Sequence, residues 1–412
     1  GFAIAEPVRV ADVIHVSGTF DDEQRRRLTA ALADPLLQHA TWDVPGSDGI
    51  EVTFLPGVTD TAADAVLHAA QQLQIDLESA ATARRIEFGN SVDVALADDI
   101  VRRVVANPVI ERWGHGLVEP PTLDDAPGHA DAELITIRGL DDEALLALNV
   151  DRSLYLDLEE LRAIRDHFDG LGRDITDVEI ETLAQTWSEH CAHKTFRAII
   201  DATGGPDGPA EVTPLMAQLR ACTESIDAPF VRSAFVGNAG VIEFTEGTTI
   251  ALKAETHNHP SAVEPFGGAN TGVGGVIRDV LGIAHRPIAV TDILCFGPGD
   301  LPMSELPDGA LHPSRIREGV IDGVADYGNK IGLPTVAGAV LYDPAYTTNP
   351  LVFAGCVGTA PSRPIHDGPF ADDRVVVLGG ATGRDGIRGA TFSSATMDAT
   401  TGEVAGASVQ IG

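Results

Sequence analysis

The sequence contains little lysine and little cysteine for its length of 412 residues. Its lysines are Lys194, Lys253 and Lys330, and every other cationic side chain is an arginine. Where one residue type is this rare, each remaining copy is a candidate for a specific contact. The four cysteines show neither the paired spacing of a zinc site nor the density of a disulfide framework. This pattern favours a reduced, cytoplasmic protein.

Long apolar runs and an excess of basic charge are also missing. No run approaches the roughly 20 apolar residues that span a bilayer, and residues 1–6 lack the features of a secretory signal. The 28 Lys and Arg residues face 61 Asp and Glu residues, which gives a formal net charge of −33. This charge argues against nucleic acid or an anionic membrane surface as the main partner.

The length predicts two or three domains, and an internal repeat marks the first. The expected elements are a strand at 8–16, a helix from 21 to about 32, a strand at 50–55, a helix at 61–73, a second copy of the first strand beginning at 85–88, and a helix from about 97. No catalytic-looking cluster occurs among them. We therefore expect a small duplicated α+β domain that serves packing or assembly.

The predicted fold class is mixed α+β, with a duplicated small α+β domain at the start of the sequence. The predicted divisions are 1–115 for the duplicated domain, 116–173 for a linker with short helices, 174–362 for a domain with the candidate catalytic and ligand-binding residues, and 363–412 for the incomplete start of a further domain. In that last part, residues 374–378 read as a strand.

A helix with several histidines is expected at the start of the predicted domain at 174–362. Residues 176–179 have the form of a capping box, so the helix should begin there. Helical spacing puts Cys191 in the buried stripe, which predicts a structural thiol and not a nucleophile. His190 and His193, beside Lys194, lie on another face. They either contact an anionic ligand or form an ordinary exposed surface.

A strand expected at 249–260 carries the densest set of charged and proton-transferring side chains in the sequence. Because side chains alternate along a strand, one face is expected to carry Lys253, Glu255, His257 and His259. An ordinary strand would not place an ammonium, a carboxylate and two imidazoles on one side. This face is therefore a candidate active site.

A glycine-rich run follows the strand and is interpreted as a phosphate-binding loop, because glycine lets the backbone approach a polyphosphate. Its glycines are Gly267, Gly268, Gly272, Gly274 and Gly275. Glu255 and Asp279, one on each side of the run, can hold a partly hydrated Mg²⁺ against phosphate oxygens. Arg278 offers a bidentate grip on a phosphate or carboxylate.

Other nucleotide and metal sites fit this region less well. No Gly-Lys-Ser/Thr follows the glycines, so the run is not a Walker A motif. The glycines at 379–386 have the wrong spacing for a dinucleotide fingerprint. A zinc site built from His257 and His259 remains open, although no cysteine or third histidine is near in sequence.

Several of these segments together resemble the synthetase subunit of phosphoribosylformylglycinamidine synthase. The resemblance rests on residues 187–191, 252–279, 327–336, 383–386 and 409–412, and it extends from about 174 to the end of the sequence. The repeat at 7–113 resembles the small accessory subunit of the same pathway step. The resemblance implies a fold shared with aminoimidazole ribonucleotide synthetase.

The resemblance also implies a reaction: formylglycinamide ribonucleotide becomes the amidine, with ATP and with ammonia released from glutamine. ATP would phosphorylate the amide oxygen, and ammonia would displace the phosphate. His190 and His257 would be the active-site histidines, with His257 as the proton acceptor. Lys253 and His193 would contact ATP, although several relatives have tyrosine at the position of His193.

The remaining implied contacts involve the metal and the ribonucleotide. Glu255 and Asp279 would bind Mg²⁺. The ribonucleotide would contact Thr256, His257, Asn258, His259, Arg278 and Gln410. Thr256 and Asn258 would face away from His257 in an ideal strand, so we expect a turn just before Pro260.

The family's synthetase has two related halves, and this sequence covers the first domain of the first half and the start of the next. A separate glutaminase subunit and the remaining synthetase domains are therefore expected partners. Two alternatives stay open. The first is another ATP-using enzyme of the same superfamily, such as a selenophosphate synthetase or a hydrogenase-maturation protein. The second is a non-catalytic fragment or assembly subunit.

Overall fold

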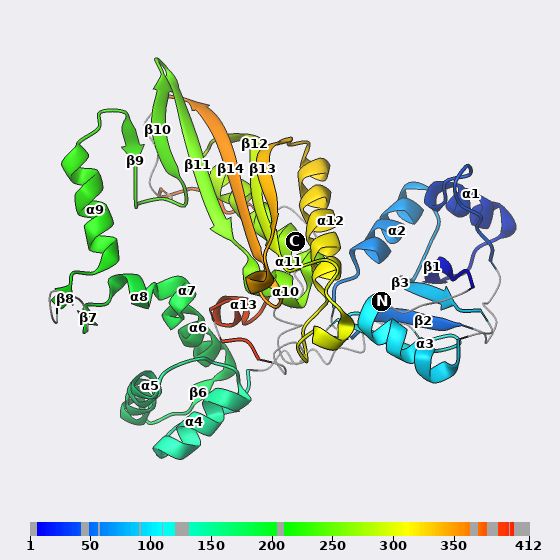
Figure 1. The fold of residues 1–412 in the computed structure, drawn as a ribbon, viewed down its shortest axis with the longest axis horizontal. Helices are drawn as coiled ribbons and strands as arrows, with labels where there is room; N and C mark the ends of the chain where they lie inside the picture. The colour runs from blue at the N-terminus through cyan, green and yellow to red at the C-terminus, as the bar shows by residue number, and fades with distance from the viewer. Residues whose placement is uncertain are drawn as a thin grey trace. The chain divides into compact units, whose positions relative to one another are not determined.

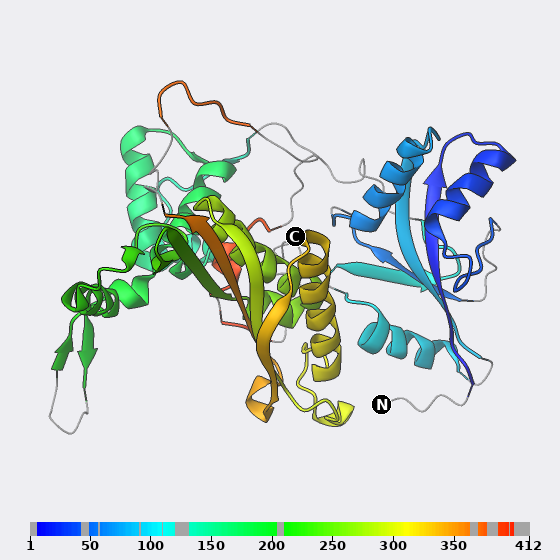
Figure 2. The same ribbon diagram turned by 90° about the horizontal axis from the view of Figure 1, so that it is seen from above.

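The structure is a computed structural model of the chain (Figures 1 and 2). It describes residues 6–42, 49–56, 58–89, 92–108, 110–119, 132–203, 210–362, 370–376, 386–394 and 396–398. Two compact units are present: Gly1–Gly128 with Pro302–Ser304 and Thr382–Asp385, and the remainder of the chain. The expected mixed α+β class is confirmed, whereas the predicted domain boundaries stay predictions.

The first unit is a four-stranded antiparallel sheet with helices on it. Its elements are β1 (Arg9–Ser17), α1 (Asp22–Leu32), β2 (Ile50–Phe54), α2 (Thr61–Gln72), β3 (Ser79–Glu87), α3 (Val94–Ile100), the π-helix η1 (Val101–Val105) and β4 (Glu111–His115). The strand order is β1-β3-β2-β4. The second copy of the first strand, expected to begin at 85–88, is wrong in its bounds, because residues 85–87 form the end of β3. β1 and β3 pair antiparallel along their whole lengths. The duplication itself stays a prediction.

A cluster of helices opens the described part of the second unit. Its elements are β5 (Leu134–Ile135), α4 (Asp142–Asp151), α5 (Leu158–Leu171), β6 (Ile175–Thr176) and α6 (Asp177–Trp187). Ile137, Leu161 and Ile180 belong to one buried core. The helix with the predicted capping box, α6, therefore packs with the helices that precede it, and the box itself is formed by Thr176 and Glu179.

The expected long helix does not continue through the histidines, and the prediction of a buried Cys191 is wrong. Ser188 is extended (φ −61°, ψ 157°), so α6 ends at Trp187 and a separate short helix, α7 (Glu189–Ala192), begins. This break changes the helical phase that would have put Cys191 under α6. The Cys191 thiol is exposed, whereas Cys295 and Cys356 are the buried ones.

A six-stranded sheet forms the centre of the second unit, in the order β13-β12-β14-β11-β10-β9. The elements of this region are α8 (Lys194–Arg197), β7 (Ile200–Ala202), β8 (Ala210–Val212), α9 (Leu215–Ile226), β9 (Val231–Ser233), β10 (Gly240–Thr245), β11 (Thr248–Thr256), α10 (Asn258–Val263), α11 (Pro265–Gly282), β12 (Arg286–Phe296), α12 (Pro313–Ile331), β13 (Thr335–Tyr342), η4 (Pro344–Tyr346), β14 (Leu351–Pro361) and α13 (Gly389–Phe392). Between β12 and α12 the chain also forms the short helix η3 (Met303–Glu305), whose first two residues belong to the first unit.

α11 and α12 lie side by side against one face of this sheet (Figures 1 and 2). Ala251, Val276 and Ala354 belong to the core between α11 and the strands. The other face presents apolar side chains to solvent, with Leu252 54% and Leu341 55% exposed. The side chains of β11 therefore divide between a helix-covered face and an open one.

The strand predicted at 374–378 is not formed in its described part. Residues 374–376 have no regular structure, and Val375 is 94% exposed. None of the described strands pairs with this segment, so its backbone groups lack the ladder partners that a strand needs. Among the described residues, no helix combines the length and apolarity needed to cross a bilayer.

Candidate functional site

The end of β11 gathers the predicted charged groups on the helix-covered face. Lys253 and Glu255 alternate with exposed Leu252 and Ala254, and they point toward α11. The approach is close: a Cβ added to Gly275 would lie 3.7 Å from a carboxylate oxygen of Glu255. The predicted alternation is therefore correct for Lys253 and Glu255.

Lys253 connects the two predicted metal-binding carboxylates. Its Nζ lies 2.9 Å from Oδ2 of Asp279 and 3.5 Å from Oε2 of Glu255. Burial alone would lower the pKa of Lys253, but the hydrogen bond to Asp279 and the two negative charges raise it above its ordinary value. The lysine is therefore firmly cationic, and both carboxylates converge on one cation.

The same two carboxylates fit Mg²⁺, which prefers hard oxygen ligands and keeps several waters. Among the described residues, no group of three or more His, Cys, Asp and Glu side chains is arranged to hold a metal. The pair would therefore need waters or phosphate oxygens to complete the coordination. The alternative of a zinc site on His257 and His259 gains no support in this part of the chain.

His257 lies where the strand turns into a helix. β11 ends at Thr256, and His257 (φ −126°, ψ 53°) precedes α10. Its backbone N–H donates to the carbonyl of Val352 at 2.8 Å, which fixes the turn against β14. The expected turn before Pro260 is thus present, and it begins at His257 with Pro260 inside the helix.

The imidazole of His257 is largely buried, and burial lowers its pKa, although the charge of Glu255 opposes the shift. Its Nδ1 atom is buried and makes no hydrogen bond to any described residue. A neutral imidazole with an available nitrogen can accept a proton at neutral pH. The charge of His190 also contributes to lowering the pKa of His257.

His190 is held by a part of the chain far away in sequence. Its Nδ1 lies 3.2 Å from the hydroxyl oxygen of Ser393. Arg388, just before α13, makes hydrogen bonds of 3.0 and 2.8 Å to a carboxylate oxygen of Glu181 on α6. The ring of Phe392 lies edge-on to that of His259, with centroids 6.2 Å apart. The α13 segment therefore contacts both His190 and His259.

The predicted phosphate-binding loop is not formed, so that interpretation is wrong. Gly267, Gly268, Gly272, Gly274 and Gly275 all lie within helix α11. The backbone N–H of Gly267 donates to the Glu264 carboxylate, and that of Gly268 donates to the Glu264 carbonyl. The N–H groups of the later glycines are within the body of the helix, where they form its hydrogen bonds. Any contact of these glycines with ATP stays a prediction, without a loop to make it.

The glycines of α11 instead permit close packing. A Cβ at Gly268 would lie 2.5 Å from the backbone of Pro260, and one at Gly274 would lie 2.6 Å from the ring of Tyr327 on α12. Such distances exclude a side chain without displacement of a neighbour. The glycine run therefore brings α11 close to α10 and α12, and thereby places Asp279 near β11.

Several other predicted residues lie apart from this group or in ordinary contacts. Thr256 is exposed on the opposite side of β11 from Glu255, and Asn258 accepts a hydrogen bond of 2.8 Å from the backbone of Val352. His193 is exposed and adopts a left-handed conformation with φ 53°. Arg278 is exposed, and its Nε donates to the carbonyl of Gly274. Gln410 lies outside the described residues.

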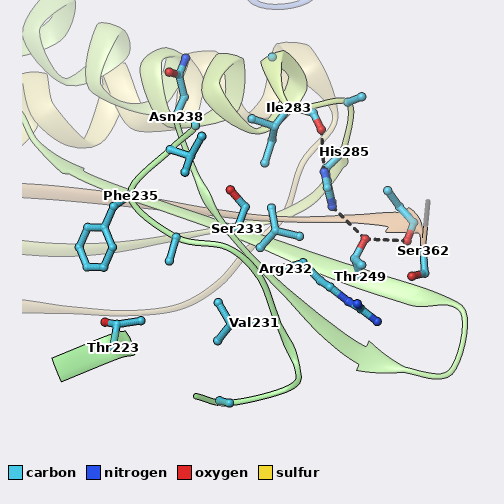
Figure 3. Close-up of a pocket in the computed structure, with 18 of the residues that line it drawn as sticks. Thr223, Val231, Arg232, Ser233, Phe235, Asn238, Thr249, Ile283, His285 and Ser362 are labelled. Carbon is cyan, nitrogen blue, oxygen red and sulfur yellow. Dashed lines mark hydrogen bonds between the residues drawn. The ribbon is translucent and has the colours of Figure 1, made fainter. Parts of the chain in front are cut away.

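The structure adds a residue that sequence reasoning missed. Asn238 donates from Nδ2 to Oδ1 of Asp279 at 3.1 Å. It lines a hollow of about 1700 Å³ formed by α9, β9, the α11–β12 turn and the end of β14 (Figure 3). On the opposite wall, His285 contacts Thr249. No local pattern marks Asn238, because its partner is 41 residues away.

Two segments of the second unit match known families. Residues 236–360 match the family described as AIR synthase related protein, N-terminal domain, and residues 145–194 match the formylglycinamide ribonucleotide amidotransferase linker domain. The first match spans all strands of the six-stranded sheet except β9, together with α11 and α12. The linker-domain match includes α5 and α6, which share one buried core, and it extends to His190 and His193.

The chain is also similar to individual proteins. It is 41% identical over 265 residues to the phosphoribosylformylglycinamidine synthase subunit PurL of Thermoplasma volcanium, covering 64% of this chain and 32% of that protein. A structure of T. maritima PurL complexed with FGAR is 34% identical, covers 56% of this chain and 32% of that one, and has a TM-score of 0.38. A T. maritima PurL complexed with ATP is 32% identical, covers 60% and 34%, and has a TM-score of 0.37.

The chain therefore spans about a third of the length of these relatives. The predicted resemblance to the synthetase subunit of phosphoribosylformylglycinamidine synthase is confirmed over the matched part. The predicted likeness of residues 7–113 to the accessory subunit stays a prediction.

Proposed function

We propose that the chain is part of an ATP-dependent ligase that converts formylglycinamide ribonucleotide to the amidine in purine biosynthesis. The observation that carries the proposal is the cluster of Lys253, Glu255, Asp279 and His257, in a chain that is 41% identical over 265 residues to PurL of T. volcanium. Nitrogen would come from ammonia released from glutamine by a separate subunit. The remaining synthetase domains and a reducing cytoplasm belong to the same proposal.

The charged groups suit phosphoryl transfer, which depends on positioning and charge stabilisation more than on covalent chemistry by the protein. Glu255 and Asp279 would hold Mg²⁺, which neutralises phosphate charge when it is bound. Lys253 is cationic beside both carboxylates and would contact the phosphates of ATP. The second predicted ATP contact, His193, lies on the exposed corner between α7 and α8.

His257 would accept a proton during the attack of ammonia on the phosphorylated amide. A general base must be unprotonated at the working pH, and the lowered pKa of His257 meets that condition. His190 would act beside it, in an orientation set by its contact with Ser393. The proposed contacts of the ribonucleotide are His257 itself and the polar side chains of Thr256, Asn258, His259, Arg278 and Gln410.

The test is ADP release from ATP with Mg²⁺ and ammonium, with and without formylglycinamide ribonucleotide. We expect release that requires the ribonucleotide and is lost in His257→Ala. His39→Ala, an exposed histidine of the first unit, is the control and should behave as the unaltered protein. The assay is run on the chain alone and on the chain joined to the remaining synthetase domains.

The outcomes separate the proposals. Release only from the joined protein would mean that this chain is one part of the enzyme, as its 32% coverage of the relative suggests. ADP release without any need for the ribonucleotide would point to another enzyme of the superfamily. Unchanged release in His257→Ala would remove His257 from the mechanism.

A further inference from the structure

Asn238 joins the hollow in Figure 3 to the candidate metal site. It lies between β9 and β10, next to Ala239, which is buried at the base of β10. From there its side-chain amide reaches α11 and donates to Oδ1 of Asp279 at 3.1 Å. Two segments far apart in sequence therefore meet at one carboxylate.

Each oxygen of Asp279 has a donor of its own. Asn238 donates to Oδ1, and Lys253 donates to Oδ2 at 2.9 Å. The terminal torsion of an aspartate is broad and only weakly restricted by its own rotamers. Donors on both oxygens therefore restrict the plane of the carboxylate.

The amide of asparagine suits this position because it is neutral. A lysine in its place would bring a second positive charge that competes with a metal ion for the carboxylate. An aspartate would add negative charge and offer no hydrogen to Oδ1. Metal-binding carboxylates in proteins are commonly oriented by such hydrogen bonds from a second layer of residues.

We propose that Asn238 is a positioning residue that orients Asp279 for binding a divalent cation. The inference rests on the proposed function, because it assumes that Glu255 and Asp279 bind Mg²⁺. Asn238 does not itself contact the metal. Its removal should weaken metal binding about 10- to 100-fold, the usual effect of losing an orienting partner, and leave the fold intact.

The test measures Mn²⁺ binding by electron paramagnetic resonance, as a probe for the Mg²⁺ site, with the full chain at high ionic strength. Salt screens the acidic surface, which would otherwise attract the probe. The variants are Asn238→Ala, Asn238→Asp and Asp279→Asn. Ser233→Ala is the matched control, since Ser233 lines the same hollow. Circular dichroism checks that each variant is folded.

We expect Asp279→Asn to lose the tight Mn²⁺ site, both Asn238 variants to weaken it, and Ser233→Ala to leave it unchanged. If Asp279→Asn loses binding while folded Asn238→Ala and Asn238→Asp bind as tightly as the unaltered protein, the positioning role is wrong and the metal site stands. If Asp279→Asn binds as well as the unaltered protein, the metal site of the proposed function is wrong, and the role of Asn238 is wrong with it.

Discussion

Glu255 and Asp292 lie in one row across the six-stranded sheet, because Glu255 on β11 and Asp292 on β12 are both paired with Ala354 of β14. Directly paired residues point to the same face of a sheet, so both carboxylates face the helices. Their surroundings differ. Glu255 has Lys253 at 3.5 Å, whereas neither carboxylate oxygen of Asp292 has a partner among the described residues.

Replacing Asp292 with asparagine should stabilise the protein at neutral pH. Burial raises the pKa of Asp292 to about 6, above its ordinary value of 3.8. The folded state therefore binds the proton of the Asp292 carboxyl group more tightly than the unfolded state does. The protonated carboxyl group stabilises the folded protein at low pH, and this stabilisation is lost as the pH rises through about 6. The pKa difference corresponds to about 3 kcal/mol at most.

Urea unfolding of Asp292→Asn between about pH 5 and pH 8 is the measurement. The gain in unfolding free energy over the unaltered protein should grow as the pH rises to about 6 and stay level above that, because the folded and unfolded states differ in bound protons only between the two pKa values. Asp308→Asn, which changes an exposed turn residue, should show no such growth. Parallel pH profiles for Asp292→Asn and the unaltered protein would show that Asp292 is not a buried, unpaired carboxylate.

Two alanine substitutions in α11 should have opposite effects. A Cβ at Gly272 would lie 2.9 Å from Cβ of His257, so Gly272→Ala must displace that histidine. We expect a loss of about 1–3 kcal/mol of stability, as in other overpacked cores. A Cβ added to Gly282 would meet nothing within 4 Å outside its own turn of the helix, so Gly282→Ala should be neutral or stabilise by about 0.5–1 kcal/mol.

Thermal unfolding and ADP release of the two variants give the comparison. Gly272→Ala should lose ribonucleotide-dependent activity along with stability, whereas Gly282→Ala should keep both. Equal stabilities of the two variants would contradict the close approach of α11 to His257.

Of the four cysteine thiols, two should react quickly with a thiol reagent and two should be protected by burial. Cys191 and Cys222 are exposed, whereas Cys295 and Cys356 are buried. Burial also raises the pKa of Cys356 to about 11, which removes its reactive thiolate near neutral pH. A disulfide reagent should therefore titrate two thiols in the folded protein and four after unfolding.

Cys191→Ser should reduce the fast count by one. If the count stays at two, Cys191 lies in the core as the helical pattern predicted, and the break at Ser188 is wrong.

The imidazole of His257 should titrate below its ordinary pKa of 6.5. The folded state favours the neutral imidazole. The neutral imidazole of His257 therefore stabilises the folded protein above pH 6.5, and this stabilisation is lost as the pH falls through the lowered pKa. The pH titration of the histidine signals by nuclear magnetic resonance measures this, with His257→Gln to assign the signal. A pKa at or above 6.5 would argue against His257 as a proton acceptor at neutral pH.

The sequence was sufficient to predict those parts of the site that depend on local geometry. The period of a strand placed Lys253 and Glu255 on one face correctly, and the capping box located the start of α6 at Thr176. Cys191 was misplaced because helical spacing assumes an unbroken helix. The extended conformation of Ser188 is local, but its effect on phase extends to every later residue.

The glycine run was misread because its composition fits two different needs. Glycine permits a phosphate to approach a backbone, and it equally permits another helix to approach. Only the positions of Pro260 and Tyr327 show which need applies to α11. Asn238 and Ser393 were missed for a similar reason, since their partners lie 41 and 203 residues away and no spacing rule links them.

The six glycines among the 18 residues of α11 have a consequence for the order of folding. Each glycine costs about 1 kcal/mol of helix stability relative to alanine, so this segment cannot hold a helix by itself. It becomes helical only as it packs against β11, α10 and α12. We therefore expect Asp279 to reach Lys253 only when α11 packs against the core, so that the site and the core form together.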